Sequence, residues 1–361
     1  MDRDRQNPAA GRPLAVAVIG YGYWGPNLAR NVETAAGTRL AVVCDRDPVA
    51  QGRAARLHTA TRVTDDWDSL LMDEDLDAVM IALPVSLHHR YALEALQAGK
   101  HVLVEKPLAR TVAECDELIR MADANHRVLM VGHTFEFNPA VRLVGEYVRT
   151  GELGDPYYVS MRRTNLGVVR SNENAMWSLA PHDISILIHW LQRAPVSVNA
   201  TGAALLQPGI EDVVFMSIRF EDDVIGHVHC SWLDPNKVRD ATFVGSRKMA
   251  VYNDMSSDMK VRLYDKAVIK QPSLGRYETF ARFQMLARAG DILVPKVEFC
   301  EPLALEVEHF AECIREDRAP LTDGASGRRV VAVLEAAQRS LENNGAAEPV
   351  TLGAVAATSV E

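Results

Sequence analysis

The sequence predicts an α/β protein in two parts: an N-terminal Rossmann domain with a doubly wound parallel sheet, and a C-terminal α+β domain on an open, mostly antiparallel sheet. Three observations predict this fold class. Short continuous apolar runs alternate with helical segments up to about residue 133, a glycine-rich turn at 20–25 follows the first of these runs, and longer β-like runs with few helices between them follow residue 156. A chain of 361 residues is long enough for two domains.

The first part contains five runs of strand length and four helical segments. The expected strands are 14–19, 39–44, 78–83, 101–104 and 128–131, and the expected helices are 26–36, 48–57, 88–98 and 112–125. Strands that are apolar throughout and alternate with helices are typical of a parallel sheet that is covered on both faces. We therefore expect a dinucleotide-binding domain over 12–133.

The second part begins with a helix over 138–150. The expected strands then follow at 157–164, 196–205, 212–220, 224–233, 239–252 and 261–264. Two late helices, 302–316 and 325–343, are expected to pack against the first domain or the sheet. We assign 134–343 to a domain for substrate binding and oligomerisation, and 1–11 and 344–361 to tails.

The composition is that of a soluble globular protein, with 48% hydrophobic and 24% charged residues. A net charge of -9 repels phosphate backbones, so a nucleic-acid partner is not expected. No apolar run approaches about 20 residues, so no membrane span is expected either. The five cysteines are scattered and form no Cys-x-x-Cys pair, which argues against disulfides and structural zinc and fits a reducing cytoplasm. The polar N-terminus does not resemble a secretory signal.

The segment Gly20-Tyr21-Gly22-Tyr23-Trp24-Gly25 has the G-x-G-x-x-G pattern of a dinucleotide fingerprint. It follows an apolar strand, opens a helix and is followed 20 residues later by an acid, Asp45, which is the context that the fingerprint requires. Gly20 allows the tight turn, Gly22 lets the backbone approach a pyrophosphate, and Gly25 lets the helix pack closely. The helix N-terminus then faces the anion. We expect Tyr23 and Trp24 to line the same cofactor site.

Asp45 is expected to bind the ribose hydroxyls of the cofactor and to repel a 2′-phosphate, which favours NAD over NADP. Arg46 follows directly and could instead bind such a phosphate or stack on adenine. The choice between the two cofactors therefore depends on which of these two side chains dominates.

Two further segments lie at the carboxyl ends of predicted strands, where parallel sheets bind their ligands. Leu83 ends the third strand, with Pro84 and His88 after it, and Glu105 and Lys106 directly follow the fourth. We expect all five to lie at the cofactor site. The alternatives are a capping or packing role for His88 and an inert surface position for Lys106.

In sequence order, these motifs resemble those of the Gfo/Idh/MocA family of oxidoreductases. The resemblance extends over about 14–343 and is strongest to the bacterial sugar 3-dehydrogenases and 3-ketoreductases of nucleotide-sugar and aminosugar pathways. The phrases that carry it are Gly22-Tyr23-Trp24-Gly25-Pro26-Asn27, Val104-Glu105-Lys106-Pro107-Leu108, Gly132-His133-Thr134-Phe135, Pro181-His182-Asp183-Ile184-Ser185-Ile186-Leu187 and Val244-Gly245-Ser246-Arg247-Lys248-Met249.

The resemblance implies hydride transfer between a sugar carbon and nicotinamide, with Lys106 in the active site and His182 as the acid–base residue. A histidine suits this task because it titrates near neutral pH. Family members usually carry an aspartate four residues before this histidine, where this chain has Ser178. A serine supplies no charge to hold an imidazolium, and Asp183 is no substitute because neighbours on a helix point apart.

Four more side chains are candidates for sugar binding: Trp177 through its ring face, and Arg163, Asn165 and His133 through polar groups. Core, structural or surface roles are the alternative for each. His227 and His229 share one strand face, but no third metal ligand accompanies them, so no metal site is expected.

We therefore expect an NAD(P)-dependent oxidoreductase that acts on a ring hydroxyl, at C3, of a nucleotide-linked or amino sugar or an aminoglycoside, a chemistry that also occurs in antibiotic biosynthesis. One alternative is a 3-ketoreductase that uses NADPH. Another, which Ser178 favours, is a non-catalytic regulatory protein that binds NAD(P). The open sheet predicts a homodimer or homotetramer, because a long uncovered sheet is otherwise a liability.

Overall fold

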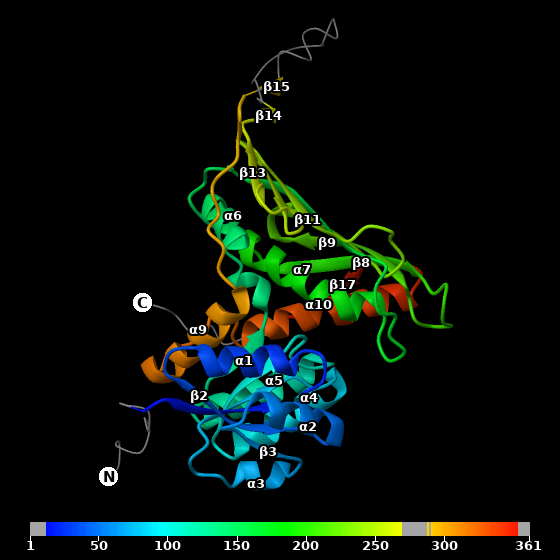
Figure 1. Cartoon of the computed structure of the whole chain (residues 1–361). Coiled ribbons are helices and arrows are strands. Elements are labelled where there is room, and N and C mark those ends of the chain that lie inside the picture. Colours follow the sequence, from blue (N-terminus) through cyan, green and yellow to red (C-terminus); the bar gives the residue numbers. More distant parts are fainter. Residues whose placement is uncertain (1–11, 269–286, 289, 353–361) are drawn as a thin grey trace, which may run out of the picture. The chain divides into compact units, whose positions relative to one another are not determined.

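The computed structural model describes residues 12–268, 287–288 and 290–352 (Figure 1). The chain divides into two compact units. The first comprises residues up to Phe137 together with Cys300–Val331, and the second comprises Asn138–Phe299 and the residues from Ala332 onward.

The first unit is a six-stranded sheet of order β3-β2-β1-β4-β5-β6, in which every pair of neighbouring strands is parallel. This confirms the predicted Rossmann sheet. Its strands are β1 (Leu14–Ile19), β2 (Thr38–Cys44), β3 (Arg62–Thr64), β4 (Ala78–Ile81), β5 (His101–Glu105) and β6 (Leu129–Gly132). Its helices are α1 (Gly25–Thr34), α2 (Pro48–Leu57), α3 (Trp67–Leu71), α4 (Val85–Gln97), α5 (Val112–Ala124), η1 (Thr134–Phe137) and α9 (Pro302–Glu316).

Each face of this sheet has its own apolar core, as period-2 alternation along a strand requires. Along β1, Val16 and Val18 join the core that includes residues of α1 and α9, whereas Ala17 and Ile19 join the core that includes residues of α4 and α5. The sheet is therefore covered on both sides, and its carboxyl edge is left to carry the ligand site.

The second unit is a nine-stranded mixed sheet of order β16-β13-β12-β11-β7-β10-β9-β8-β17. All neighbouring strands are antiparallel except β7 and β10, which run parallel. Its strands are β7 (Pro156–Thr164), β8 (Pro195–Ala203), β9 (Val213–Phe220), β10 (Ile225–Ser231), β11 (Val238–Gly245), β12 (Met249–Asn253), β13 (Val261–Tyr264), β16 (Ile292–Leu293) and β17 (Glu348–Pro349), with a separate pair β14 (Ala267–Val268) and β15 (Ala287–Arg288). Its helices are α6 (Pro139–Arg149), α7 (Ala175–Leu191) and η2 (Glu221–Asp223), while α10 (Gly324–Glu342) belongs to both units.

The open, mostly antiparallel sheet is thus confirmed, although several of its elements differ from those expected. The run 239–252, expected as one strand, is a hairpin of β11 and β12, because the chain turns at Ser246–Arg247 and the Gly245 amide donates to the Lys248 carbonyl. The 17-residue helix α7, which has His182 in its middle, was not among the expected helices. In the first unit, β3 and α3 were not expected, because both are too short for a clear periodic pattern.

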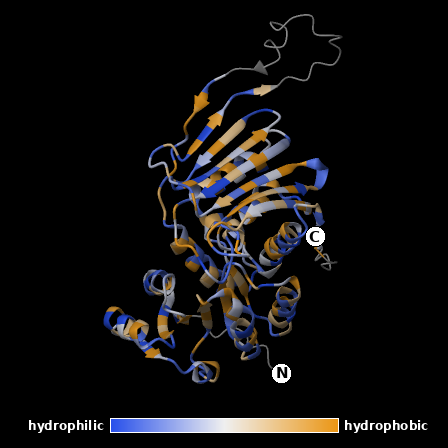
Figure 2. Ribbon diagram, turned by 90° about the vertical axis from the view of Figure 1, so that its right-hand side faces the viewer, coloured by the Kyte–Doolittle hydropathy of each residue, from blue (hydrophilic) through white to orange (hydrophobic). Residues whose placement is uncertain are grey.

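Hydropathy is mixed along the sheet of the second unit (Figure 2). Val159, Met161 and Arg163 of β7 are buried on the face that α7 covers, whereas Tyr158 and Arg162 on the opposite face are exposed. No helix in the described part of the chain is long and apolar enough to cross a membrane.

Candidate functional site

The glycine turn after β1 has the geometry that the fingerprint predicts. Gly20 has φ +91°, and a Cβ atom there would lie 2.7 Å from the Ala82 carbonyl oxygen. A Cβ on Gly25 would lie 2.0 Å from the Gly20 carbonyl oxygen, so helix and turn approach too closely for any side chain. Around Gly22, in contrast, a Cβ would meet no atom of the described residues within 4 Å. The bare backbone of Gly22 therefore borders open space where a pyrophosphate could approach.

The first turn of α1 is also suited to an anion. Trp24 occupies the N-cap without a side-chain cap, Pro26 stands in the first turn, and that turn contains no acidic residue. The positive end of the helix dipole is thus not neutralised by its own first turn. These features fit the pyrophosphate of a dinucleotide. Tyr23 is 91% exposed beside this turn and Trp24 is half-buried.

Asp45 at the end of β2 is tied to the same turn. Its Oδ2 accepts a hydrogen bond from the Tyr21 amide at 2.5 Å, and its Oδ1 accepts one from the Asp47 amide at 2.8 Å. A carboxylate has about four lone-pair positions, so Asp45 retains capacity for ribose hydroxyls. Arg46 is exposed next to it.

The surroundings of His88 favour the packing alternative over the predicted contact with the cofactor. Its side chain is buried, its Nδ1 lies 2.8 Å from the Pro107 carbonyl oxygen, and its Nε2 lies 2.7 Å from the Leu83 carbonyl oxygen. Burial lowers the pKa of the imidazole. His88 therefore joins the turn after β4 to the segment that carries Lys106. Leu83 is half-buried and Pro84 exposed at that turn.

Lys106 directly follows β5, which pairs with β4, and β4 pairs with β1. The glycine turn, the Leu83–Pro84 turn and Lys106 thus lie at the carboxyl ends of three adjacent strands. Lys106 is partly exposed, and its peptide bond to Pro107 is cis. Burial raises the pKa of the neighbouring Glu105 carboxyl to about 7, although the positive charge of Lys106 opposes this rise.

His133 is fully buried, which favours a structural role over the predicted contact with a sugar. Burial lowers the pKa of its imidazole to about 3, with a further contribution from the charge of Lys106. His133 is therefore a neutral group that interacts with the lysine.

Helix α7 carries the proposed acid–base residue of the second unit. Asn174 caps the helix by accepting from the Trp177 amide at 3.1 Å. Pro181 lies inside the helix and has no N–H to donate to the Trp177 carbonyl, so the regular ladder is interrupted one residue before His182. His182 is partly exposed, and Ser178, one turn earlier, is 9% exposed.

Arg163, a predicted sugar contact, forms a buried ion pair in the structure. Its guanidinium makes three hydrogen bonds of 2.8 to 3.1 Å to the Asp183 carboxylate. The two side chains are 4% and 2% exposed. This ion pair fastens α7 to β7 at the residue next to His182, and it also explains why Asp183 cannot support the histidine.

The other two predicted sugar contacts stay partly exposed. The Trp177 indole N–H donates to Gln338 of α10 at 3.2 Å, which orients the ring. The backbone N–H of Asn165, just beyond the end of β7, donates to the Ser231 carbonyl at 3.1 Å. Both remain candidates for contact with a sugar.

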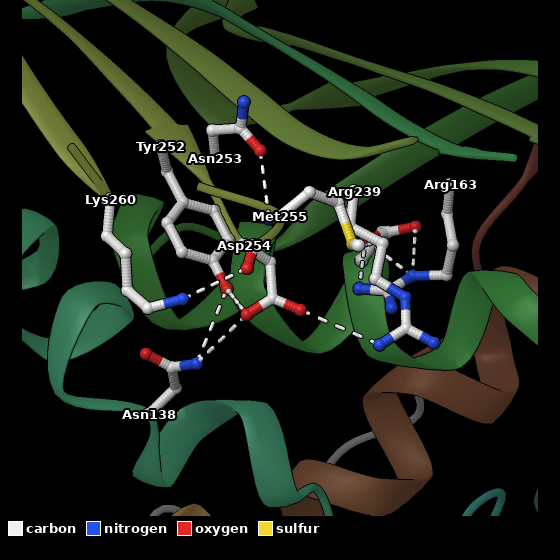
Figure 3. A network of polar contacts seen from close by, with 9 residues as sticks. Asn138, Arg163, Arg239, Tyr252, Asn253, Asp254, Met255 and Lys260 are labelled. Atoms are coloured by element: carbon white, nitrogen blue, oxygen red, sulfur yellow. Dashed lines mark hydrogen bonds and ion pairs between the residues drawn. The ribbon is translucent and has the colours of Figure 1, made fainter. Parts of the chain in front are cut away.

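Figure 3 shows a polar network in the second unit that sequence reasoning missed. Asp254 lies at its centre: its Oδ1 accepts from the Tyr252 hydroxyl at 3.1 Å, and its Oδ2 lies 3.6 Å from Arg239. The Lys260 ammonium donates to the Asp254 carbonyl at 3.0 Å, and Asn138 lies 3.4 Å from the Tyr252 hydroxyl. Burial raises the pKa of the Tyr252 phenol, so it stays a hydrogen-bond donor.

Glu306 of α9 was also missed, although a signal was present. Leu303, Val307, Phe310 and Ile314 recur at helical spacing and are buried, and Glu306 lies among them with 0% exposure. A single acid on an apolar helix face indicates a buried polar contact. The Asp254 network had no such signal, because its partners come from four separate segments. Among the described residues, no group of three or more potential ligands could hold a metal ion.

Comparison with known families agrees with these two halves. The profile of the oxidoreductase family with an NAD-binding Rossmann fold matches residues 14–133, and that of the GFO/IDH/MocA C-terminal domain matches 141–251. Inositol 2-dehydrogenase 2 from Paenarthrobacter aurescens is 31% identical over 225 residues, which cover 59% of this chain and 67% of that protein.

A second relative matches almost end to end. UDP-N-acetylglucosamine 3-dehydrogenase from Acidithiobacillus ferrooxidans is 29% identical over 324 residues, 88% of this chain and 94% of that protein. Its crystal structure superposes with a TM-score of 0.77 and covers 91% of this chain and 98% of that one. A levoglucosan dehydrogenase solved with NADH shares the fold, with a TM-score of 0.80 at 22% identity, over 94% of this chain and 100% of that one.

Proposed function

Because the chain belongs to the Gfo/Idh/MocA family of oxidoreductases with an NAD-binding Rossmann domain, we propose that it oxidises a ring secondary alcohol of a sugar with NAD. The observation that carries this proposal is the position of Lys106. It follows the strand two places from β1 in the sheet, at the same edge as the glycine turn. A cationic side chain at this edge can stabilise the negative charge that develops on the oxygen of an alcohol as the alcohol loses a proton and a hydride.

In this proposal residues 12–133 bind the cofactor and residues 134–343 supply the sugar site. Gly20, Gly22 and Gly25 with the N-terminus of α1 hold the pyrophosphate, and Asp45 holds the adenosine ribose. Asp45 selects NAD, since a 2′-phosphate would meet its negative charge. When bound, the cofactor provides a nicotinamide carbon that accepts hydride.

In this proposal His182 transfers the proton and Lys106 stabilises the charge on the oxygen. As the carbinol carbon loses hydride, the imidazole of His182 takes the hydroxyl proton, so that the O–H bond breaks and a carbonyl forms. The ammonium of Lys106 stabilises the oxygen while negative charge develops on it. In the reverse direction the same imidazole returns the proton.

Ser178 does not act as a base in this scheme. Its hydroxyl stays protonated at neutral pH unless another base activates it. We assign it a hydrogen bond to the sugar or to His182, one helical turn away. The ion pair of Arg163 and Asp183 then holds the helix that carries both residues.

The substrate class follows from the relative that matches over nearly the whole chain, a UDP-N-acetylglucosamine 3-dehydrogenase. We therefore propose oxidation at C3 of a nucleotide-linked or amino sugar. We also propose a homodimer or homotetramer that buries one face of the second sheet. Phe215 stacks on His229 there at 4.3 Å, and the exposed Ile225 lies four residues before His229 on the same face of β10. The five cysteines are free thiols, which supports a reducing cytoplasm.

The test is a panel of substrates with NAD and with NADP. UDP-N-acetylglucosamine, its free sugar and inositol are each mixed with the enzyme, and reduced nicotinamide is followed by absorbance. We expect reduction of NAD with the nucleotide sugar and little with inositol. Tight cofactor binding without turnover on any of them would instead favour a regulatory protein.

A further inference from the structure

Two buried carboxyl groups of the first unit, those of Glu136 and Glu306, interact with each other and with the partly buried Glu105, which directly precedes Lys106. Glu105 ends β5, Glu136 belongs to η1, and Glu306 comes from α9, much further along the chain. Glu306 is 0% and Glu136 3% exposed. Buried carboxylates are costly unless they are paired or protonated, so their protonation bears on the lysine beside them.

Neighbouring residues make close contacts with two of these carboxyl groups. Glu105 pairs with Gly132 of β6, and a Cβ atom at Gly132 would lie 3.1 Å from the Glu105 Cδ and Oε2 atoms. The Thr134 hydroxyl donates to Glu306 Oε2 at 2.9 Å. The other oxygen of each acid, Oε1 of Glu105 and Oε1 of Glu306, is buried without a hydrogen-bond partner among the described residues.

Electrostatics oppose ionisation of both acids. Burial raises the pKa of Glu306 well above its usual value, and the charges of Glu105 and Glu136 add to the rise. Burial also raises the pKa of Glu105 to about 7, against the charge of Lys106. Among the described residues, the charged groups that act on Glu306 are Glu105 at the end of β5 and Glu136 of η1, while Lys106 acts on Glu105 and on His133.

We propose that Glu306 is a positioning residue for the reaction: Glu306 and Glu105 hold one proton between them, so that Lys106 faces a single carboxylate charge. This inference rests on the proposed role of Lys106, but its first test does not need a substrate.

That test is isotope-edited infrared spectroscopy of the full chain labelled with ¹³C-glutamate at pH 8. Ordinary glutamates, with a pKa of about 4.3, are ionised there, so a carboxylic-acid band reports only strongly shifted groups. We expect the band in the wild type, in E105Q, and in the control E308Q, whose site is exposed on the same helix. We expect E306Q to lose it, since Glu105 alone ionises. An absent wild-type band, or a band unchanged in E306Q, overturns the proposal.

A second variant covers the case in which E306Q does not fold. T134V removes the hydroxyl that favours ionised Glu306, so its band should persist to a pH about 1 unit higher than in the wild type. An unshifted band in folded T134V contradicts the shared proton.

The functional test is the pH profile of kcat/KM for a sugar that the wild type oxidises. E306Q should shift the half-maximal pH by about 1 unit relative to E308Q, whereas a purely structural role would lower stability and leave the profile in place. An unshifted profile overturns the link to Lys106. If the wild type oxidises no sugar, the proposed function fails, and the infrared band still decides where the proton lies.

Discussion

The ion pair between Arg163 and Asp183 offers the sharpest test of how the second unit holds His182. R163M keeps a long apolar side chain but removes the guanidinium and all three of its hydrogen bonds to Asp183. Asp183 is 1% exposed, so its charge would be left buried and unpaired. Removing one partner of a buried ion pair costs about 3–5 kcal/mol, which is a large part of the roughly 5–15 kcal/mol that stabilises a typical domain.

The assay is urea unfolding followed by circular dichroism, with R162M as the matched control. Arg162 is the next residue on β7, points to the opposite face and is 56% exposed in its pair with Asp240. An exposed pair contributes about 0–1 kcal/mol. If R163M loses no more unfolding free energy than R162M, the assignment of a stabilising buried pair is wrong.

A double variant separates the lost pair from the lost packing. In R163M combined with D183L no buried charge remains, and replacing both partners by apolar groups is often close to neutral. We expect this variant to regain most of the unfolding free energy that R163M loses. The affinity for NAD should be unchanged in all three variants, because neither residue belongs to the cofactor site.

Three further predictions concern the first unit. D45A should weaken NAD binding by about 10- to 100-fold, the value of a hydrogen bond to a charged group, and calorimetry that finds an equal loss for NADP would remove Asp45 as the selecting residue. G25A should destabilise the fold because its Cβ would lie 2.0 Å from the Gly20 carbonyl oxygen, whereas G22A should leave thermal stability nearly unchanged and weaken NAD binding; equal melting temperatures would contradict this. Burial, and to a smaller extent the charge of Arg127, lowers the pKa of His101 from 6.5 to about 3. As the pH falls from 6.5 to 3, the unfolded chain therefore protonates this histidine before the folded chain does. The free energy of unfolding then decreases by up to about 1.4 kcal/mol per pH unit. H101Q should make that decline shallower in urea titrations, and an identical slope would argue against a neutral His101 in the folded chain.

Local patterns were sufficient to predict most of the first unit. The turn at Gly20, Gly22 and Gly25 is specified by short-range sterics, and a pattern of neighbouring residues records such constraints directly. The position of Lys106 followed from strand order, since every strand of a parallel sheet presents its carboxyl end at the same edge.

Long-range partners could not be predicted in the same way. His88, Arg163 and His133 carry polar groups that suit a ligand, and the sequence does not say whether the fold buries them. In the structure two backbone carbonyls contact His88, and Asp183 takes up Arg163. A contact between polar side chains about 20 residues apart does not produce a periodic pattern in the sequence.

The C-terminal helices illustrate the same limit. The sequence allowed α9 to pack on either part of the chain, and Arg30 of α1 pairs with Glu301 just before α9. Glu306 reaches the cluster around Glu105 only because of this packing. Its lone polar position on an apolar helix face was visible in the sequence, but its neighbours were not.

The central claim is that His182 accepts the proton when the sugar hydroxyl is oxidised. The most direct measurement is steady-state turnover of H182A on the sugar that the wild type oxidises, together with NAD binding by fluorescence. Loss of a general base typically lowers the rate by about 10²–10⁴-fold, so we expect kcat to fall in this range while the Kd for NAD stays the same. S178A should cost much less. Turnover of H182A at the wild-type rate would contradict the account and leave Lys106 or a tyrosine as the proton acceptor.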